Sequence, residues 1–171
     1  MDFIQIIDDF LNKDEISLLL RQLNTEEYQY GHTSGGGDKL TICFFSTSKE
    51  IELKTLIFNK IQNYVSKKLK VDRFYVHTQN FGQDGKYHVD TELPHTYSFC
   101  LYVNDVPDSM ENTYGDFLFK IPYDNKIICV ESKLNRGVFF PSTYLHKGLP
   151  YNRFYHNRRM CVTFKFTEIV E

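Results

Sequence analysis

The spacing of apolar residues marks the first part of the chain as helical. Apolar side chains recur at helical intervals over residues 13–24, which predicts an amphipathic helix. The apolar members are Ile16, Leu19, Leu20 and Leu23. Asn12 directly precedes this stretch and Glu15 follows, which is the sequence pattern of a capping box. We therefore expect the helix to begin just after Asn12.

Another helix, two strands and a loop are predicted before residue 73. A longer apolar stripe predicts a second helix over about residues 49–70, with a lysine-rich face turned to solvent. Residues 2–8 and 39–45 predict short strands. Residues 31–38 read GHTSGGGD, and consecutive glycines make a flexible loop. This loop is either a flap over a site or an ordinary surface loop, and the sequence leaves both interpretations open.

From residue 73 onward the periodicity changes to that of strands, and Phe and Tyr, which favour strands, are abundant. The predicted strands cover 73–81, 86–90, 96–104, 115–120, 126–132, 136–141 and 158–168. Two helices followed by many short strands is typical of a β core with a helical N-terminal cover. We therefore predict a mainly β protein with one domain over residues 1–171. Residues 1–72 would form the helical cover and first strands, and residues 73–168 the β core.

Two of the predicted strands have one apolar and one mixed polar face. In 96–104 and 158–166 the polar faces carry Tyr102 and Arg159 respectively. We expect the apolar faces to pack under the helices and the polar faces to line a pocket. A buried arginine is unfavourable unless a carboxylate meets it, so the pattern indicates an acidic small-molecule ligand. Tyr102 could donate a second hydrogen bond to that ligand.

A pattern of metal ligands accompanies this pocket. His88 and Asp90 are one residue apart, which places both side chains on one face of a strand, and His146 follows later. Two imidazoles and one carboxylate are the facial triad of non-haem Fe(II) oxygenases, which leaves open positions on the metal. We expect four other histidines to face solvent or substrate: His32, His77, His95 and His156.

Charge and cysteine content restrict the class of protein. The net charge of −2 disfavours a broad attraction to nucleic acid. The four cysteines lie far apart in apolar runs, so we expect buried free thiols; they are Cys43, Cys100, Cys129 and Cys161. The chain starts without a basic leader and has no apolar run near the ~20 residues that span a bilayer. We therefore expect an intracellular, cytoplasmic protein outside membranes.

Several stretches together resemble a known family. They are FGQDGKYHVDTE, FCLYVND, YGDFLF, RGVFFPS, His146 and RRMCVTFKF, in this order. In this order they are similar to landmarks of the 2-oxoglutarate and Fe(II)-dependent dioxygenases, prolyl 4-hydroxylase-like branch, over roughly residues 73–167. The resemblance implies a double-stranded β-helix of the jelly-roll, cupin-like type with helices packed on one sheet.

The resemblance also implies roles for five residues. His88, Asp90 and His146 would be the catalytic metal ligands for Fe(II). Arg159 and Tyr102 would bind the distal carboxylate of the co-substrate 2-oxoglutarate. O2 would take the remaining metal position, and ascorbate would serve as reductant.

The implied reaction converts 2-oxoglutarate to succinate and CO2 while a C–H bond is hydroxylated. The substrate expected from the resemblance is a prolyl residue in a protein or peptide. A second hypothesis is that the substrate is a free amino acid, another small molecule or a modified nucleobase. A third hypothesis is that the protein is a jelly-roll module that binds without turnover. Two residues depart from the family pattern: Phe81 lies near a place where relatives often carry a co-substrate-facing tyrosine, and Cys161 stands where a serine is common.

Overall fold

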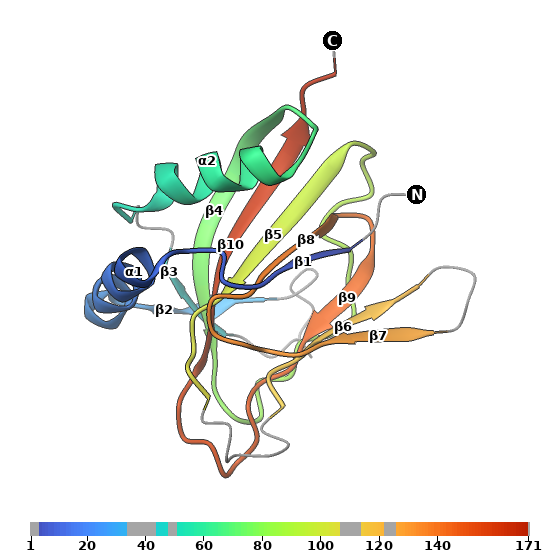
Figure 1. Ribbon diagram of the computed structural model, residues 1–171. Coiled ribbons are helices and arrows are strands. Elements are labelled where there is room, and N and C mark those ends of the chain that lie inside the picture. The colour runs from blue at the N-terminus through green and yellow to red at the C-terminus, as the bar shows by residue number, and fades with distance from the viewer. Residues whose placement is uncertain (1–3, 34–43, 48–50, 107–113, 122–125, 171) are drawn as a thin grey trace.

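Within the residues that the structure describes, two antiparallel sheets and two helices form the protein (Figure 1). The computed structural model describes residues 4–33, 44–47, 51–106, 114–121 and 126–170. The seven-stranded sheet has the order β1-β8-β5-β10-β4-β3-β2. Its strands are β1 Gln5–Ile7, β2 Gln29–His32, β3 Phe44–Thr47, β4 Leu69–Gln79, β5 Thr96–Tyr102, β8 Gly137–Pro141 and β10 Arg159–Glu168.

The second sheet has the order β7-β6-β9, with β6 Phe117–Lys120, β7 Ile127–Val130 and β9 Leu145–Gly148. The helices are α1 Lys13–Thr25 and α2 Lys54–Tyr64. β10 lies in the middle of the larger sheet, where Arg159 pairs with Gln79 of β4 and Cys161 pairs with Tyr102 of β5. This register brings the polar positions of three strands onto one face.

Two apolar cores lie on opposite faces of β5 and β10. One core joins these strands to both helices, and its members include Leu19, Leu23, Ile57, Ile61, Phe99, Leu101, Val162 and Phe164. The other core joins them to the smaller sheet and includes Cys100, Tyr102, Cys161, Phe117 and Phe119. Successive residues of each strand thus alternate between the two cores. The alternation predicted for residues 96–104 and 158–166 is confirmed.

The first helix begins where the sequence predicts. Asn12 Oδ1 accepts hydrogen bonds from the backbone N–H groups of Asp14 and Glu15, at 3.0 and 2.9 Å. The Glu15 carboxylate accepts the Asn12 N–H at 2.8 Å, which completes a capping box. These bonds satisfy N–H groups that have no partner inside the helix.

Replacement of Asn12 by alanine is expected to lower the free energy of unfolding by about 1 kcal/mol, because the first turn loses its cap. Equilibrium unfolding in urea measures this. Asn12→Asp is the matched control, since a carboxylate accepts the same bonds. Equal stability of Asn12→Ala and the unaltered protein would contradict a stabilising cap.

The second helix is shorter than predicted. α2 ends at Tyr64, and Val65 already has extended backbone angles. β4 then starts at Leu69. The Leu69 N–H donates a hydrogen bond of 2.9 Å to Gln62 Oε1 at the end of α2. Val71 pairs with Phe166 of β10. The prediction of one helix over residues 49–70 is therefore wrong at its end, because pairing with β10 outweighs local helical periodicity.

Most predicted strands are present. The segments 96–104, 115–120, 126–132, 136–141 and 158–168 contain β5, β6, β7, β8 and β10, and the segment 73–81 overlaps β4, which begins earlier, at Leu69. The segment 86–90 is not a strand, since only His88 forms an isolated bridge. The sequence missed β2 and β9, which are short, contain glycine and become strands through pairing with β3 and β6. In the predicted strand 39–45, residues 39–43 lie outside the described residues, as do residues 34–38 of the glycine-rich loop.

The cysteine prediction holds for two residues. Cys100 and Cys161 are buried and free. Cys129 is free but exposed, which corrects the expectation of burial. It lies in β7 at the end of the smaller sheet, where three of four residues face solvent. Cys43 lies outside the described residues.

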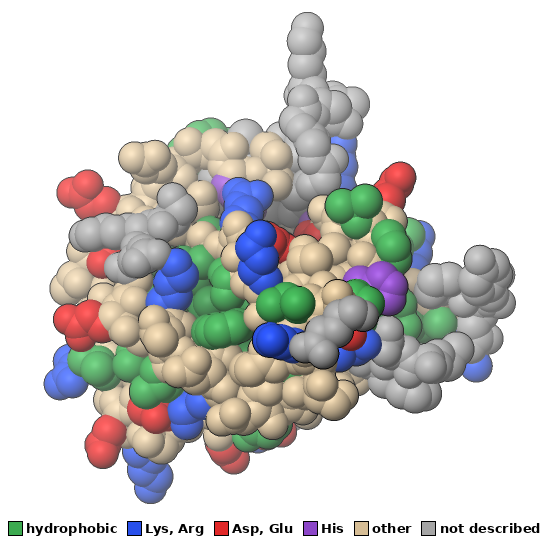
Figure 2. All heavy atoms as spheres, turned by 90° about the horizontal axis from the view of Figure 1, so that it is seen from above, with side chains coloured by type: hydrophobic (Ala, Val, Ile, Leu, Met, Phe, Trp, Pro, Cys, Tyr) green, Lys and Arg blue, Asp and Glu red, His purple; other side chains and the backbone are tan. Residues whose placement is uncertain are grey.

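The surface carries mixed charge. On the face shown in Figure 2, basic side chains are scattered among acidic, hydrophobic and uncharged ones. This agrees with the small net charge of −2. Neither described helix has the length and apolarity needed to cross a membrane.

Candidate functional site

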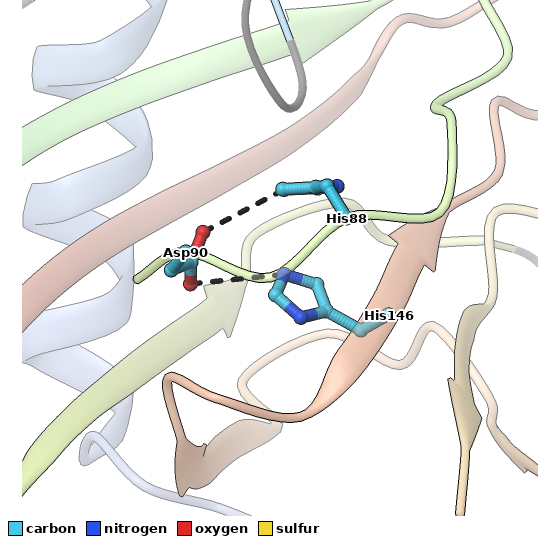
Figure 3. A group of neighbouring side chains, drawn as sticks. All are labelled: His88, Asp90 and His146. Carbon is cyan, nitrogen blue, oxygen red and sulfur yellow. Dashed lines mark ion pairs between the residues drawn. The ribbon is translucent and has the colours of Figure 1, made fainter. Parts of the chain in front are cut away.

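Three side chains converge in the structure: His88, Asp90 and His146 (Figure 3). Asp90 faces both imidazoles, whose ring centroids are 4.4 Å apart. His88 Nε2 is 3.6 Å from Asp90 Oδ1, and His146 Nε2 is 3.7 Å from Oδ2. Their potential ligand atoms all lie within 4.8 Å of one another. Among the described residues, this is the group of His, Cys, Asp and Glu side chains that could hold a metal ion.

Backbone pairing sets this arrangement. His88 and His146 exchange two backbone hydrogen bonds of 2.9 Å, although they lie far apart in sequence. The Asp90 N–H donates to Ser142 O at 2.9 Å. Because this extended segment alternates like a strand, His88 and Asp90 point the same way. The same-face expectation is therefore correct although no regular strand forms.

Both imidazoles are oriented by backbone carbonyls. His88 Nδ1 lies 2.9 Å from Lys86 O, and His146 Nδ1 lies 2.7 Å from Tyr144 O. A carbonyl oxygen only accepts, so each Nδ1 carries the proton and each Nε2 presents its lone pair towards Asp90. Such outer hydrogen bonds fix the tautomer of metal-binding histidines.

Burial keeps His146 neutral. Its side chain is 3% exposed and packs against Phe117 and Phe140, with ring centroids 5.1 and 4.9 Å away. Burial, helped by the charge of Lys165, lowers the pKa of His146 to about 4 despite the opposing charge of Asp90. A neutral imidazole is the form that binds metal.

Asp90 is held in its charged form. Ser98 Oγ donates to Oδ2 at 2.6 Å, and the Lys165 ammonium contacts the same oxygen. Burial alone raises the pKa of Asp90, but the charge and the hydrogen bond of the Lys165 ammonium help to outweigh burial, and the pKa lies well below its usual range. Asp90 therefore presents a carboxylate and not a neutral acid.

Arg159 provides a buried positive charge close by. Its side chain is 1% exposed, and Nε donates to Gly115 O at 2.7 Å. Nη1 donates to Gln79 Oε1 at 2.7 Å, and Nη2 to the Tyr102 hydroxyl at 3.3 Å. The partners are a carbonyl, an amide and a hydroxyl, all neutral. No ion pair joins Arg159 to a carboxylate among the described residues.

A buried guanidinium without a carboxylate partner favours the binding of an anion, because desolvation of its charge is otherwise uncompensated. One pocket of about 1040 Å³ is lined by Arg159 together with His88, Asp90 and His146. An acidic ligand held by Arg159 would therefore share this space with a metal held by the other three side chains.

Two neighbours of Arg159 were not foreseen from the sequence. Gln79 and His77 lie on β4, and His77 Nε2 is 3.3 Å from Arg159 Nη1. The feature that could have identified them is their location on β4, the strand that pairs with the strand of Arg159. Phe81, in contrast, is 65% exposed and does not line the pocket. Cys161 is buried beside Tyr102.

The other histidines stay out of the metal group. His32 and His77 line the pocket, with nearly parallel rings 6.1 Å apart. His95 is largely exposed and lies 3.3 Å from the Glu168 carboxylate. His156 is exposed. The expectation that histidines face solvent is thus confirmed for His95 and His156, and a substrate-facing role of His32 and His77 stays a prediction.

Comparisons based on sequence find no relatives: no family model matches the chain, and no curated protein does. Comparisons of structure do. A prolyl hydroxylase from Trichoplax adhaerens, solved with a hypoxia inducible factor peptide fragment, is similar with a TM-score of 0.70 and 13% identity. The match covers 98% of this chain and 84% of that one.

Two further structures are similar. A Pseudomonas putida prolyl-4-hydroxylase matches with a TM-score of 0.66 and 13% identity over 99% of this chain and 94% of its own. The α-ketoglutarate-dependent epimerase SnoN of nogalamycin biosynthesis matches with a TM-score of 0.70 and 13% identity over 97% and 78%. Another SnoN structure contains Fe³⁺, α-ketoglutarate and nogalamycin RO. At these identities the likeness shows the fold, which is the jelly roll of the 2-oxoglutarate-Fe(II) oxygenases.

Proposed function

We propose that this chain, which has the fold of the 2-oxoglutarate-Fe(II) oxygenases, is itself a 2-oxoglutarate- and Fe(II)-dependent dioxygenase. One observation carries the proposal: His88, Asp90 and His146 converge in the same pocket as a buried arginine without a carboxylate partner among the described residues. The fold alone is compatible with many activities, whereas this pairing of a metal donor set with an anion site matches a metal and an acidic co-substrate.

The donor set fits Fe(II). Two neutral imidazoles and one carboxylate would hold the ion and leave positions for other ligands. When bound, Fe(II) and 2-oxoglutarate supply the oxidising step, in which O2 and 2-oxoglutarate are consumed and succinate and CO2 are formed. Ascorbate would keep the iron reduced between turnovers.

The protein's own residues bind and orient. Arg159, together with the Tyr102 hydroxyl, would hold the distal carboxylate of 2-oxoglutarate. Gln79 and Gly115 O already fix two sides of the guanidinium, which pre-orients it for that carboxylate. The apolar rings of Phe117 and Phe140 beside His146 exclude water from one side of the metal ligands. Charge and position are thus set before any ligand arrives.

We propose a prolyl residue in a protein or peptide as the substrate. The Trichoplax prolyl hydroxylase, whose structure holds a peptide, supports this choice. The epimerase SnoN, whose structure is similarly close, favours a small molecule as the second candidate substrate. This second candidate includes a free amino acid and a modified nucleobase. A jelly-roll module that binds without turnover is the third alternative. We further propose that residues 1–171 form a single domain and act in the cytoplasm.

Succinate formation tests the activity. The purified protein with Fe(II), ascorbate and 2-oxoglutarate is expected to release succinate above background when proline-rich peptides are added, and the peptide should gain one oxygen atom. Succinate with free amino acids or methylated nucleobases, but not with peptides, would favour the second candidate. If the folded protein forms no succinate with any of these substrate classes, the remaining hypothesis is a jelly-roll module that binds without turnover.

Gly148 provides a more local test of the anion site. A Cβ at this position would lie 3.1 Å from Arg159 Nη1 and 3.2 Å from Cζ. Gly148→Ala should displace the guanidinium and raise the KM for 2-oxoglutarate roughly tenfold, because small displacements weaken oriented contacts. Succinate rates against 2-oxoglutarate concentration measure this. Lys147→Ala is the control, since the Lys147 ammonium lies over the Tyr87 ring, 4.9 Å from its centroid; equal KM values in both variants would contradict the role of Arg159.

A further inference from the structure

Lys165 is the one cation that contacts a member of the metal group among the described residues. It follows Arg159, Cys161 and Thr163 on the pocket face of β10, and it pairs in register with Ser98 of β5. Its ammonium contacts Asp90 Oδ2 and lies 3.2 Å from Ser98 Oγ. The Lys165 side chain is 18% exposed and that of Asp90 is 10% exposed. The pair is therefore largely removed from water.

The two oxygens of Asp90 have different surroundings. Oδ2 receives both the Ser98 hydroxyl, at 2.6 Å, and the Lys165 ammonium. Oδ1 faces the Nε2 atom of His88 at 3.6 Å. Oδ2 is thus held by Ser98 and Lys165 and also lies 3.7 Å from His146 Nε2, while Oδ1 faces His88. Asp90 is also fixed through its backbone, since its N–H donates to Ser142 O, and Ser142 Oγ lies 2.7 Å from Ser98 Oγ.

These contacts have opposite consequences for the metal-free and metal-bound protein. Without metal, the ammonium neutralises a carboxylate that would otherwise be buried with little compensation. With a divalent ion on Asp90, the same ammonium is a like charge nearby and opposes binding. Ser98 and the Asp90 backbone bond hold the carboxylate independently of Lys165. Removal of the ammonium should therefore leave Asp90 in place and remove the repulsion.

We infer that Lys165 is a built-in counter-ion of Asp90: it keeps the metal-free site folded and weakens the affinity of that site for the metal. The inference rests on the proposed function, because it takes Asp90 as a metal ligand. Lys165 acts through Asp90 and is a positioning residue.

The test uses the full chain, stripped of metal with a chelator, and Co(II) alone as the probe. Lys165→Met removes the charge and retains the length of the side chain. We expect its Kd for Co(II), measured by calorimetry, to fall about tenfold or more. The thermal midpoint of the metal-free variant should fall at the same time, so that Co(II) raises its midpoint more than that of the unaltered protein.

Three variants make the result specific. Lys165→Gln is a second neutral variant that should bind Co(II) as tightly as Lys165→Met, in case the latter fails to fold. Lys165→Arg keeps the charge and should stay within about threefold of the original Kd. Lys67→Met removes a lysine that pairs with Glu168 at 3.2 Å, away from the metal group, and should leave the Kd unchanged.

An unchanged or weaker Co(II) affinity in folded Lys165→Met and Lys165→Gln would overturn the inference. So would an effect on 2-oxoglutarate binding with no effect on Co(II), which would make Lys165 a ligand of the co-substrate. If the unaltered chain binds no Co(II), the proposed function falls together with the inference. If it binds Co(II) and makes succinate while the neutral variants keep its Kd, the inference about Lys165 alone falls.

Discussion

Replacement of His146 by alanine is expected to abolish succinate formation and metal binding. His146 supplies one of two imidazoles in the group, and its Nε2 lies 3.7 Å from Asp90. Loss of an outer hydrogen-bond partner of a metal ligand already costs roughly 10–100-fold in affinity or activity, so loss of the ligand itself should exceed about 100-fold. Calorimetry with Co(II) and a succinate assay measure the two effects.

The control for this variant is His95→Ala. His95 is exposed and pairs with Glu168, and it does not belong to the metal group. It should retain Co(II) binding and turnover. Because His146 packs against Phe117 and Phe140, the His146 variant must also show a cooperative unfolding transition. Metal binding and turnover at the original level in folded His146→Ala would contradict the proposed site and favour the binding module.

The second large effect is expected at Arg159. Arg159→Leu should raise the KM for 2-oxoglutarate at least about thirtyfold, because a desolvated charge pair is lost. The affinity for Co(II) should stay unchanged, since Arg159 contacts none of the three metal-group side chains in the described part of the chain. Separate titrations of Co(II) and 2-oxoglutarate distinguish the two sites.

Arg158→Leu is the matched control, because Arg158 is the adjacent arginine but is exposed. Its guanidinium lies over the Tyr28 ring, 5.7 Å from the centroid. A second comparison uses 2-oxopentanoate, which lacks the distal carboxylate. The unaltered protein should prefer 2-oxoglutarate strongly and Arg159→Leu should not. An unchanged preference in Arg159→Leu would show that another group binds the carboxylate.

Local patterns in the sequence predicted the elements that depend on local chemistry. Asn12 and Glu15 specified the start of α1, because a capping box needs only residues within one turn. The alternation in β5 and β10 separated the two cores, because strand side chains alternate. The end of α2 and the strand β9 were not predictable in this way. Both depend on partners far along the chain, β10 for Val71 and β6 for His146.

The candidate site was predictable in its residue types but not in its surroundings. Spacing and family resemblance singled out His88, Asp90 and His146, and the structure brings them together. Alternation placed Lys165 on the polar face of its strand, but only the register with Ser98 shows that it reaches Asp90. The position of Gln79 at Arg159 depends in the same way on pairing between β4 and β10.

The most direct test of the central claim is a crystal structure of the full chain with Mn(II) and the 2-oxoglutarate analogue N-oxalylglycine. We predict one metal ion bound by His88 Nε2, His146 Nε2 and Asp90, with the distal carboxylate of the analogue on Arg159. A metal ion bound elsewhere, or an analogue that does not reach the Arg159 guanidinium, would contradict the assignment of this pocket as an oxygenase site.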